Sequence, residues 1–285
     1  MNRSQGQLES VLERIYERYN RRELIPPDPL QFVYRYEEPL DQEMAGFVAA
    51  ALAYGRVTQI ERSVTGLLGV MGKRPGDYVR RFNDSKAAEL AGFKHRFNTG
   101  KDLAELFGVL QKVLVRFGSI ENYFAETDRD EHSTIVPVLT AFCDHLSDLY
   151  EELYQKEVSR GVKYLLASPA RGSASKRLNL FLRWMVRDDE VDPGVWQTIS
   201  PAKLVVPIDV HMERLCRILG LYGRKTVSLK AALEITESFA KVRPEDPVKY
   251  DFSLSRIGII DNCTGKLTEK CDLCELYGYC LRVRK

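Results

Sequence analysis

Apolar residues along most of the chain recur at helical rather than alternating spacing. One series begins at Leu8 and reaches Tyr19, and similar series lie within residues 103–113 and 138–149. Positions three or four apart lie on one face of an α-helix, so each series gives an apolar stripe that can face a core. The pattern predicts an all-α protein.

Prolines and glycines mark the interruptions between these helices. The prolines within residues 26–29 separate the first helix from the rest, and those within 244–247 form another boundary, because proline cannot continue a helix interior. Residues 47–55, FVAAALAYG, are too few to span a bilayer. They predict a buried helix that ends at glycine.

The segment GVKYLLASPARGSASKRLNLFLRWMVR, residues 161–187, predicts two helices joined by a tight turn. The first helix runs to about Ala167 and stops at the Ser-Pro pair that follows. The second begins with Ser173 or Ser175 as its N-cap. The segment therefore predicts a helix, a hairpin turn and a helix.

Basic side chains gather around this turn, since residues 159–187 contain seven Lys or Arg and no acid. The second helix begins with unpaired backbone N–H groups, and Arg171, Lys176 and Arg177 surround that end, so we expect a phosphate group to bind there. The simpler alternative is a solvated helix face. A second basic stretch, GFKHRF at residues 92–97, could contact a base, a phosphate or nothing.

Asp209 stands in VVPIDVHMERLCRILGLYG, where the pattern predicts the start of another helix, and Gly220 stands where that helix ends. A carboxylate in this position is most simply an N-cap that bonds the first backbone amides. His211, taken alone, is more often a packed or surface histidine than a ligand.

Composition adds limits of its own. The 285 residues are 44% apolar, enough for a sizeable core, and the net charge of +2 is too small by itself to indicate a nucleic-acid partner. No stretch reaches the roughly 18 apolar residues of a membrane span, and the first residues lack the apolar core of a signal peptide. We therefore expect a cytoplasmic protein that does not enter a membrane.

Four of the six cysteines lie in the last 23 residues, at Cys263, Cys271, Cys274 and Cys280. In a reducing compartment such a group indicates metal binding rather than disulfides. Four thiolates within 18 residues can each bind one iron of a [4Fe–4S] cluster, with structural zinc or unliganded thiols as the alternatives. Lys266 and Lys270, between the first two ligands, could then face DNA phosphates or simply solvent.

Several of these segments resemble motifs of the helix-hairpin-helix DNA glycosylase superfamily, which includes endonuclease III and the adenine and 8-oxoguanine DNA glycosylases. The cysteine segment resembles its iron–sulfur loop, with one extra residue between the first two ligands. SKRLNLFL (175–182) is similar to the helix after the hairpin, PIDVHM (207–212) to the segment with the catalytic aspartate, and AALAYGRVTQIERS (50–63) to the loop that fills the space left by a flipped base. Within the superfamily, the sequence is most similar to an uncharacterised bacterial family. The turn SPARGS departs from the usual pair of glycines, and only Gly172 matches.

The resemblance implies a fold of two helical domains. One would comprise residues 45–199 and contain the hairpin. The other would combine residues 1–44 with residues 200–285 and carry the cysteine cluster. Lys176 and Asp209 would then meet across the cleft between them.

The resemblance also implies a function. The protein would be a monomeric DNA glycosylase that removes a damaged base flipped out of double-stranded DNA, with a weak preference for oxidised purines. Asp209 would stabilise positive charge on the sugar, and Lys176 would form a Schiff base that gives AP lyase activity, unless water is the nucleophile. DNA contacts are expected from Arg171, Gly172, Ser173, Arg177, Tyr54, Arg56, Lys266, Lys270 and His211.

Two other functions stay open. A non-catalytic protein that binds DNA or RNA structure could keep the cluster as a scaffold, and the altered hairpin favours this alternative. A zinc-stabilised helical interaction module would have no nucleic-acid role at all.

Overall fold

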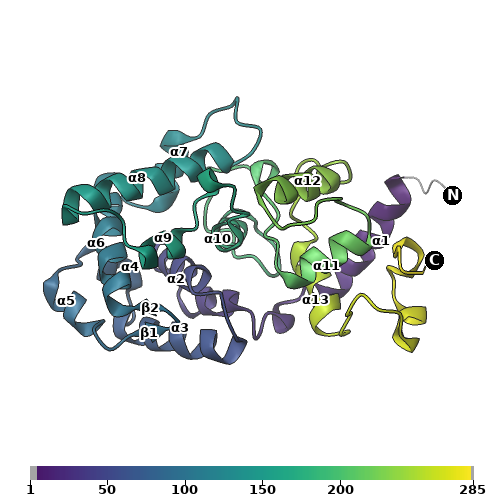
Figure 1. Ribbon diagram of the computed structural model, residues 1–285, viewed down its shortest axis with the longest axis horizontal. Coiled ribbons are helices and arrows are strands. Elements are labelled where there is room, and N and C mark those ends of the chain that lie inside the picture. The colour runs from purple at the N-terminus through teal and green to yellow at the C-terminus, as the bar shows by residue number, and fades with distance from the viewer. Residues whose placement is uncertain (1–4, 284–285) are drawn as a thin grey trace.

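A computed structural model describes residues 5–283, and most of them lie in helices (Figure 1). The α-helices are α1 (Gln5–Tyr19), α2 (Pro39–Ala51), α3 (Val57–Met71), α4 (Pro75–Arg80), α5 (Asp84–Glu89), α6 (Gly100–Phe117), α7 (Ile120–Thr127), α8 (Val136–Tyr154), α9 (Arg160–Leu166), α10 (Lys176–Val186), α11 (Val210–Ile218), α12 (Leu229–Ala240) and α13 (Asp251–Ile259). The all-α prediction is confirmed. None of these helices is long and apolar enough to cross a membrane.

Short elements connect the α-helices. They are the 3-10 helices η1 (Arg22–Leu24), η2 (Pro29–Arg35), η3 (Pro169–Arg171), η4 (Pro201–Lys203), η5 (Glu269–Leu273) and η6 (Tyr277–Tyr279), and an antiparallel hairpin of β1 (Lys94–His95) and β2 (Asn98–Thr99). The hairpin was not predicted, because two strands of two residues each leave no alternating pattern to detect.

Proline and glycine fix several helix ends as the sequence suggests. Helix α1 stops before the prolines, and η2 begins at Pro29, where the Asp28 carboxylate accepts a hydrogen bond from the Leu30 amide. The apolar segment 47–55 forms the second half of α2, but the helix ends at Ala51. The predicted end at glycine is therefore wrong, and Gly55 lies in the following turn with φ of +102°.

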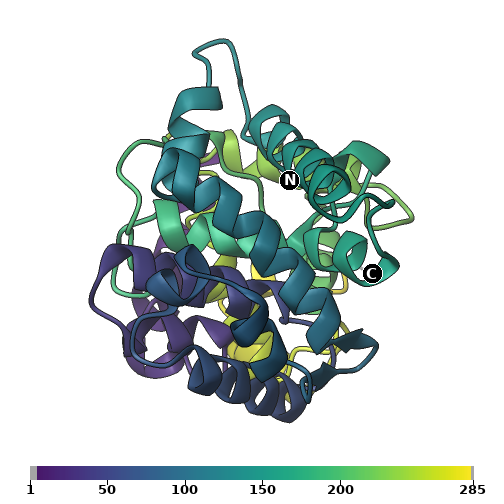
Figure 2. The ribbon, with the colours of Figure 1, turned by 90° about the vertical axis from the view of Figure 1, so that its left-hand side faces the viewer.

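Helix α10 lies in the middle of the molecule (Figure 1), with α4, α5, α6 and α8 on one side and α1, α11 and α13 on the other. Seen from the left-hand side, the helices from the middle of the chain cover the C-terminal ones (Figure 2). Phe181 of α10 packs edge-on against Phe47 of α2, with ring centroids 5.4 Å apart, and against Trp196, at 5.3 Å. Burial of such a side chain contributes about 1.5–3 kcal/mol. Most residues of α10 are buried, so this helix belongs to the core.

Helix α2 carries a buried acid, Glu43. Its carboxylate accepts hydrogen bonds from the amides of Ile120 (2.9 Å) and Glu121 (3.0 Å) at the start of α7, and from Trp196 Nε1 (2.8 Å). Burial raises the pKa of Glu43 to about 7, although these donors oppose the change. The residue thus fixes α2, α7 and Trp196 to one another.

A buried ionic network joins the far end of α10 to the C-terminal part of the chain. Arg183 pairs with Asp192 (Nη2 to Oδ1, 3.1 Å) and with Asp251 at the start of α13. Arg187 also pairs with Asp192, and with Asp246 (Nε to Oδ2, 2.9 Å). Both arginines belong to the basic run without acids, but the structure pairs them with Asp192, just beyond the run, and with Asp246 and Asp251, which are distant in sequence.

Candidate functional site

The predicted helix, turn and helix are present at residues 160–186. Helix α9 ends at Leu166, and the next residue, Ala167, has a left-handed backbone. The turn then passes through η3 to Gly172, with φ of +77°. The Leu229 amide donates a hydrogen bond to the Gly172 carbonyl (2.9 Å) and so ties the turn to the start of α12. The helix, turn and helix predicted from proline and glycine are confirmed.

Within residues 5–283, no side chain caps the start of α10. Ser175 occupies the N-cap position, but its backbone is left-handed and its hydroxyl donates to the Ala167 carbonyl (2.8 Å). The Ser173 hydroxyl accepts from the Ser175 amide instead of from the helix (3.1 Å). The predicted serine cap is thus wrong in its chemistry. The first N–H groups of α10 keep their capacity to bind an anion.

Four of the predicted contact residues line this helix start. Arg171 and Gly172 are exposed, and Ser173 and Lys176 are half-buried. Within the described chain, neither Arg171 nor Lys176 makes a side-chain hydrogen bond or an ion pair. Their charges are free to meet a phosphate.

Arg177 does not belong to this surface. Its guanidinium is buried and donates to the carbonyls of Ala51 (2.7 Å) and Tyr164, beneath the rings of Tyr164 (4.4 Å to the centroid) and Tyr54 (5.0 Å). Burial lowers its pKa. Successive helix residues point about 100° apart, so the residue after Lys176 faces the interior. The predicted contact between Arg177 and DNA is therefore wrong.

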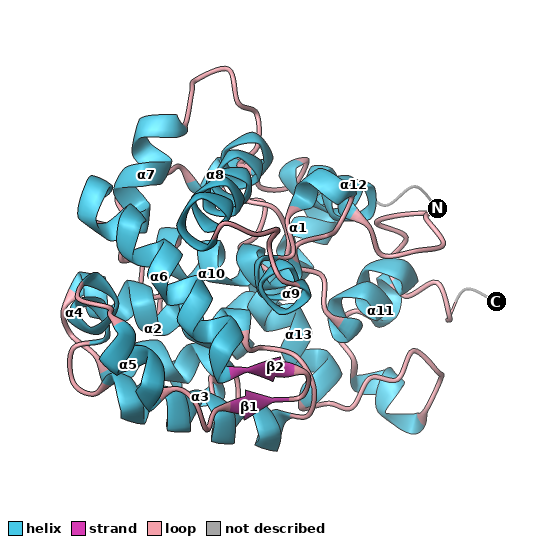
Figure 3. Ribbon diagram, turned by 60° about the vertical axis from the view of Figure 1, so that its left-hand side comes forward, coloured by secondary structure: helices cyan, strands magenta, loops and turns pink. Residues whose placement is uncertain are grey.

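Tyr54 is an anchor rather than a free side chain. Its hydroxyl lies 2.5 Å from Asn98 Oδ1 and 3.1 Å from the His95 carbonyl, which ties the turn before α3 to the β1–β2 hairpin beside that helix (Figure 3). A ring held in this way cannot extend into DNA. Of the two residues expected to fill the space left by a base, only Arg56 is exposed to solvent.

Two exposed aromatic residues, Phe97 and Tyr164, were missed by the sequence analysis. Phe97 is 53% exposed at the hairpin tip, Tyr164 is 39% exposed on α9, and their ring centroids are 4.4 Å apart. The sequence does contain a pattern that could have indicated them. Aromatic residues are interleaved with cations in the stretch GFKHRF and in the Lys-Tyr pair at 163–164. His95, by contrast, is buried, with its ring nitrogens 2.8 Å from Ser63 Oγ and 3.0 Å from the Tyr54 carbonyl.

Asp209 caps α11. Its Oδ1 accepts from the amides of His211 (2.8 Å) and Met212 (2.7 Å), which confirms the structural role expected of an N-cap carboxylate. The other oxygen, Oδ2, takes no hydrogen bond from the described residues. Asp209 also lies near Asp251, whose pKa is raised to about 7 mainly by burial, with a further contribution from the Asp209 charge.

Lys176 and Asp209 share no hydrogen bond or ion pair within residues 5–283. An indirect connection runs through α10. Arg183 of this helix pairs with Asp251, and Asp251 lies near Asp209. Seven residues separate Lys176 from Arg183, which is about 10 Å along a helix axis. The side chains of Lys176 and Asp209 are both half-buried.

His211 packs against α13. A Cβ added at Gly258 would lie 2.4 Å from His211 Nδ1, and this nitrogen is buried without a hydrogen-bond partner in the described part of the chain. The expected DNA contact of His211 is therefore replaced by a packing role.

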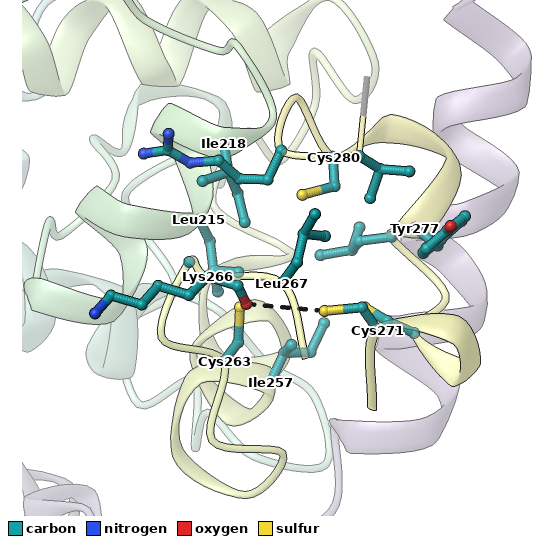
Figure 4. Close-up of a pocket in the computed structure, with 14 residues that line it drawn as sticks. Leu215, Ile218, Ile257, Cys263, Lys266, Leu267, Cys271, Tyr277 and Cys280 are labelled. Atoms are coloured by element: carbon teal, nitrogen blue, oxygen red, sulfur yellow. Dashed lines mark hydrogen bonds between the residues drawn. The ribbon is translucent and has the colours of Figure 1, made fainter. Parts of the chain in front are cut away.

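The four C-terminal cysteines line a single pocket (Figure 4). Its cavity volume is about 30 Å³, and its other walls include Leu215 and Ile218 of α11 and Ile257 of α13. The segment is fixed to these helices by hydrogen bonds from Arg214 Nη1 to the Cys263 carbonyl (2.7 Å) and from the Leu281 amide to the Ile218 carbonyl (2.7 Å). All four thiols are free and half-buried.

The thiols interact with one another and with the backbone. Burial raises the pKa of Cys274, and the neighbouring Cys263 and Cys271 raise it further. The Thr268 amide donates to Cys271 Sγ (3.3 Å). Lys266 and Lys270 are exposed, and the Lys266 side chain extends away from the sulfurs (Figure 4). Among the described residues, no group of three or more His, Cys, Asp or Glu could hold a metal ion as placed.

Comparison with known proteins gives one family. Residues 28–260 match the model of a family described as "Protein of unknown function (DUF2400)". No curated protein and no solved structure matches the chain. The membership in the helix-hairpin-helix glycosylase superfamily that the motifs suggested is thus wrong, since the match is to a different family and covers most of the chain.

Proposed function

We propose a function from geometry, because the chain belongs to the DUF2400 family and the description of that family names none. The proposal is that the protein binds DNA at the turn between α9 and α10 and excises a damaged base. The observation that carries it is the uncapped start of α10, where Lys176 has no partner in the described chain and Arg171 is exposed.

DNA binding would depend mainly on phosphates. The free N–H groups of α10 and the charge of Arg171 suit one phosphate group, and Arg56 suits another. Such contacts position a duplex without reading its sequence. Binding is therefore expected to weaken steeply as the salt concentration rises.

Excision requires a base outside the duplex, since the glycosidic bond cannot be reached within the stack. A neutral Lys176 amine would attack C1′ of the sugar, the bond electrons would leave with the base, and the base would then take up a proton. The nitrogen would then lose its protons, a C=N bond would form as the C1′–O4′ bond breaks, and O4′ would take up one of these protons. The resulting Schiff base would allow AP lyase activity. The unbonded Oδ2 of Asp209 suits the stabilisation of positive charge on the sugar. The flipped nucleotide would have to lie between these two side chains.

We further propose that Cys263, Cys271, Cys274 and Cys280 hold a [4Fe–4S] cluster. The donor set fits, because four free thiols line one pocket and a backbone amide already bonds one sulfur. When bound, the cluster would fold the C-terminal loop and present Lys266 and Lys270 to DNA. It would belong to a second helical domain beside residues 45–199, in a monomeric protein of the reducing cytoplasm.

The test is covalent trapping. Duplexes that carry oxidised, deaminated or abasic lesions are incubated with the protein and borohydride. We expect a trapped complex with at least one lesion and its loss in Lys176→Ala, whereas Lys112→Ala, an exposed lysine of α6, should trap normally. The enzyme proposal fails if no lesion is cut or trapped and Asp209→Asn behaves as the wild type.

A second function is favoured by one observation, the absence of contact between Lys176 and Asp209 in the described chain. The protein would then bind bent or branched nucleic acid without chemistry. It would bind such substrates in a salt-dependent way and release no base even at high enzyme excess. Detection of a released base would exclude this alternative.

A further inference from the structure

Three segments distant in sequence meet at Phe97 and Tyr164. Phe97 belongs to the β1–β2 hairpin, Tyr164 to α9, and Tyr54, which contacts both, to the turn after α2 (Figure 3). The Tyr54 ring is roughly parallel to Phe97 (30°, centroids 5.5 Å apart) and edge-on to Tyr164 (4.9 Å). We refer to Phe97 and Tyr164, whose rings are partly exposed, as the aromatic platform.

A hydrogen bond and cation–π contacts hold the segments of the platform in place. The Asn98 side chain donates to the Gly161 carbonyl (3.0 Å) and so joins the hairpin to α9. The buried guanidinium of Arg177 lies beneath the Tyr54 and Tyr164 rings. Rings fixed in this way lose little conformational freedom when a flat ligand stacks on them.

Exposed cations stand close in sequence to the aromatic residues of the three segments. Lys94, Arg96, Lys163 and Arg56 are all exposed. The Arg96 side chain extends over Gly55, where an added Cβ would lie 3.0 Å from Arg96 Cδ. The Asp102 carboxylate, which accepts hydrogen bonds from the Thr99 amide (2.8 Å) and the Ser159 hydroxyl (3.3 Å), carries a single negative charge and cannot balance all of these cations.

The two rings of the platform lie edge-on to each other (82°), so only one of them can carry a stacked base. We propose that Phe97 of the aromatic platform stacks an unpaired base of DNA, while Arg96 and Lys163 hold the flanking phosphates. Exposed aromatic faces beside cations suit single-stranded nucleic acid, since every base has a face to stack and every nucleotide a charge to pair. An apolar protein partner would leave these cations without counter-charges. The inference rests on the proposed DNA binding but uses residues other than Lys176 and Asp209.

A tryptophan at the platform would report stacking directly. The native Trp184 and Trp196 are fully buried, so Phe97→Trp introduces an exposed indole. We expect a short oligothymidylate to quench its emission strongly, and a blunt duplex of equal length to quench it less. Binding without quenching would overturn the proposal.

Affinity gives the second measurement. Phe97→Ala should weaken oligothymidylate binding about 5- to 100-fold, as loss of one stacked base does. Val115→Ala, which trims a side chain 69% exposed on α6, should bind as the wild type. Unchanged binding by Phe97→Ala, or tighter binding of oligouridylate than of oligothymidylate, would contradict the proposal. Failure of the platform alone would leave Lys176 trapping intact, whereas a wild type that binds no DNA would refute both proposals.

Discussion

The buried carboxyl group of Glu43 should make the stability of the fold depend on pH, and Glu43→Gln should remove that contribution. The pKa of this group rises from 4.5 in its ordinary state to about 7 in the folded protein, chiefly through burial. The folded state therefore holds the proton more tightly than the unfolded state. The stability gained in this way is fully present below pH 4.5 and is lost as the pH rises through 7. At about 1.4 kcal/mol per pH unit, the interval corresponds to about 3 kcal/mol.

The amide that Glu43→Gln introduces resembles the protonated acid in shape and cannot ionise. Urea unfolding at pH 4.5 and at about pH 8, followed by tryptophan fluorescence, gives the free energy of unfolding of both proteins. From pH 4.5 to about pH 8, the free energy of unfolding of the variant should rise by about 3 kcal/mol relative to that of the wild type. Glu37→Gln, at an exposed position, serves as the control. The reasoning would be refuted if the free energies of unfolding of the variant and the wild type differed by the same amount at both pH values.

Three further predictions concern the core and the site. Phe181→Ala should lower the free energy of unfolding by about 3–5 kcal/mol through the cavity it leaves, as urea unfolding would measure. Asp209→Asn should keep the α11 cap, and so change the melting temperature little, but abolish base release in a lesion assay. Cys274→Ser should remove the brown colour of anaerobically purified protein, whereas Cys143→Ser should keep it; colour in both variants would contradict the cluster.

The sequence predicted best what neighbouring residues decide. The ends of α9, the turn through Gly172 and the start of α11 at Asp209 follow from proline, glycine and capping chemistry within a few residues. The start of α10 shows the limit of such rules, because the Ser175 hydroxyl bonds the Ala167 carbonyl across the turn instead of the helix.

Long-range partners could not be predicted. Arg177 and Arg183 belong to a run of cations that looks like a solvated face, and only the fold reveals that carbonyls and acids from other segments enclose them. The incorrect assignment to the glycosylase superfamily also arose because a short motif does not show what its residues contact in the fold. A motif such as PIDVHM describes a capped helix start, and many unrelated helices need the same cap. The aromatic platform is likewise a product of three segments, none of which indicates it alone.

The ionic network at the end of α10 also has a consequence for synthesis on the ribosome. Arg183 and Arg187 both pair with Asp192, which is made soon after them, whereas their other partners, Asp251 and Asp246, are made much later. Loss of one partner from a buried ion pair costs about 3–5 kcal/mol. The nascent chain can therefore form only part of this network before α13 has left the exit tunnel, and this end of α10 should complete its packing only then.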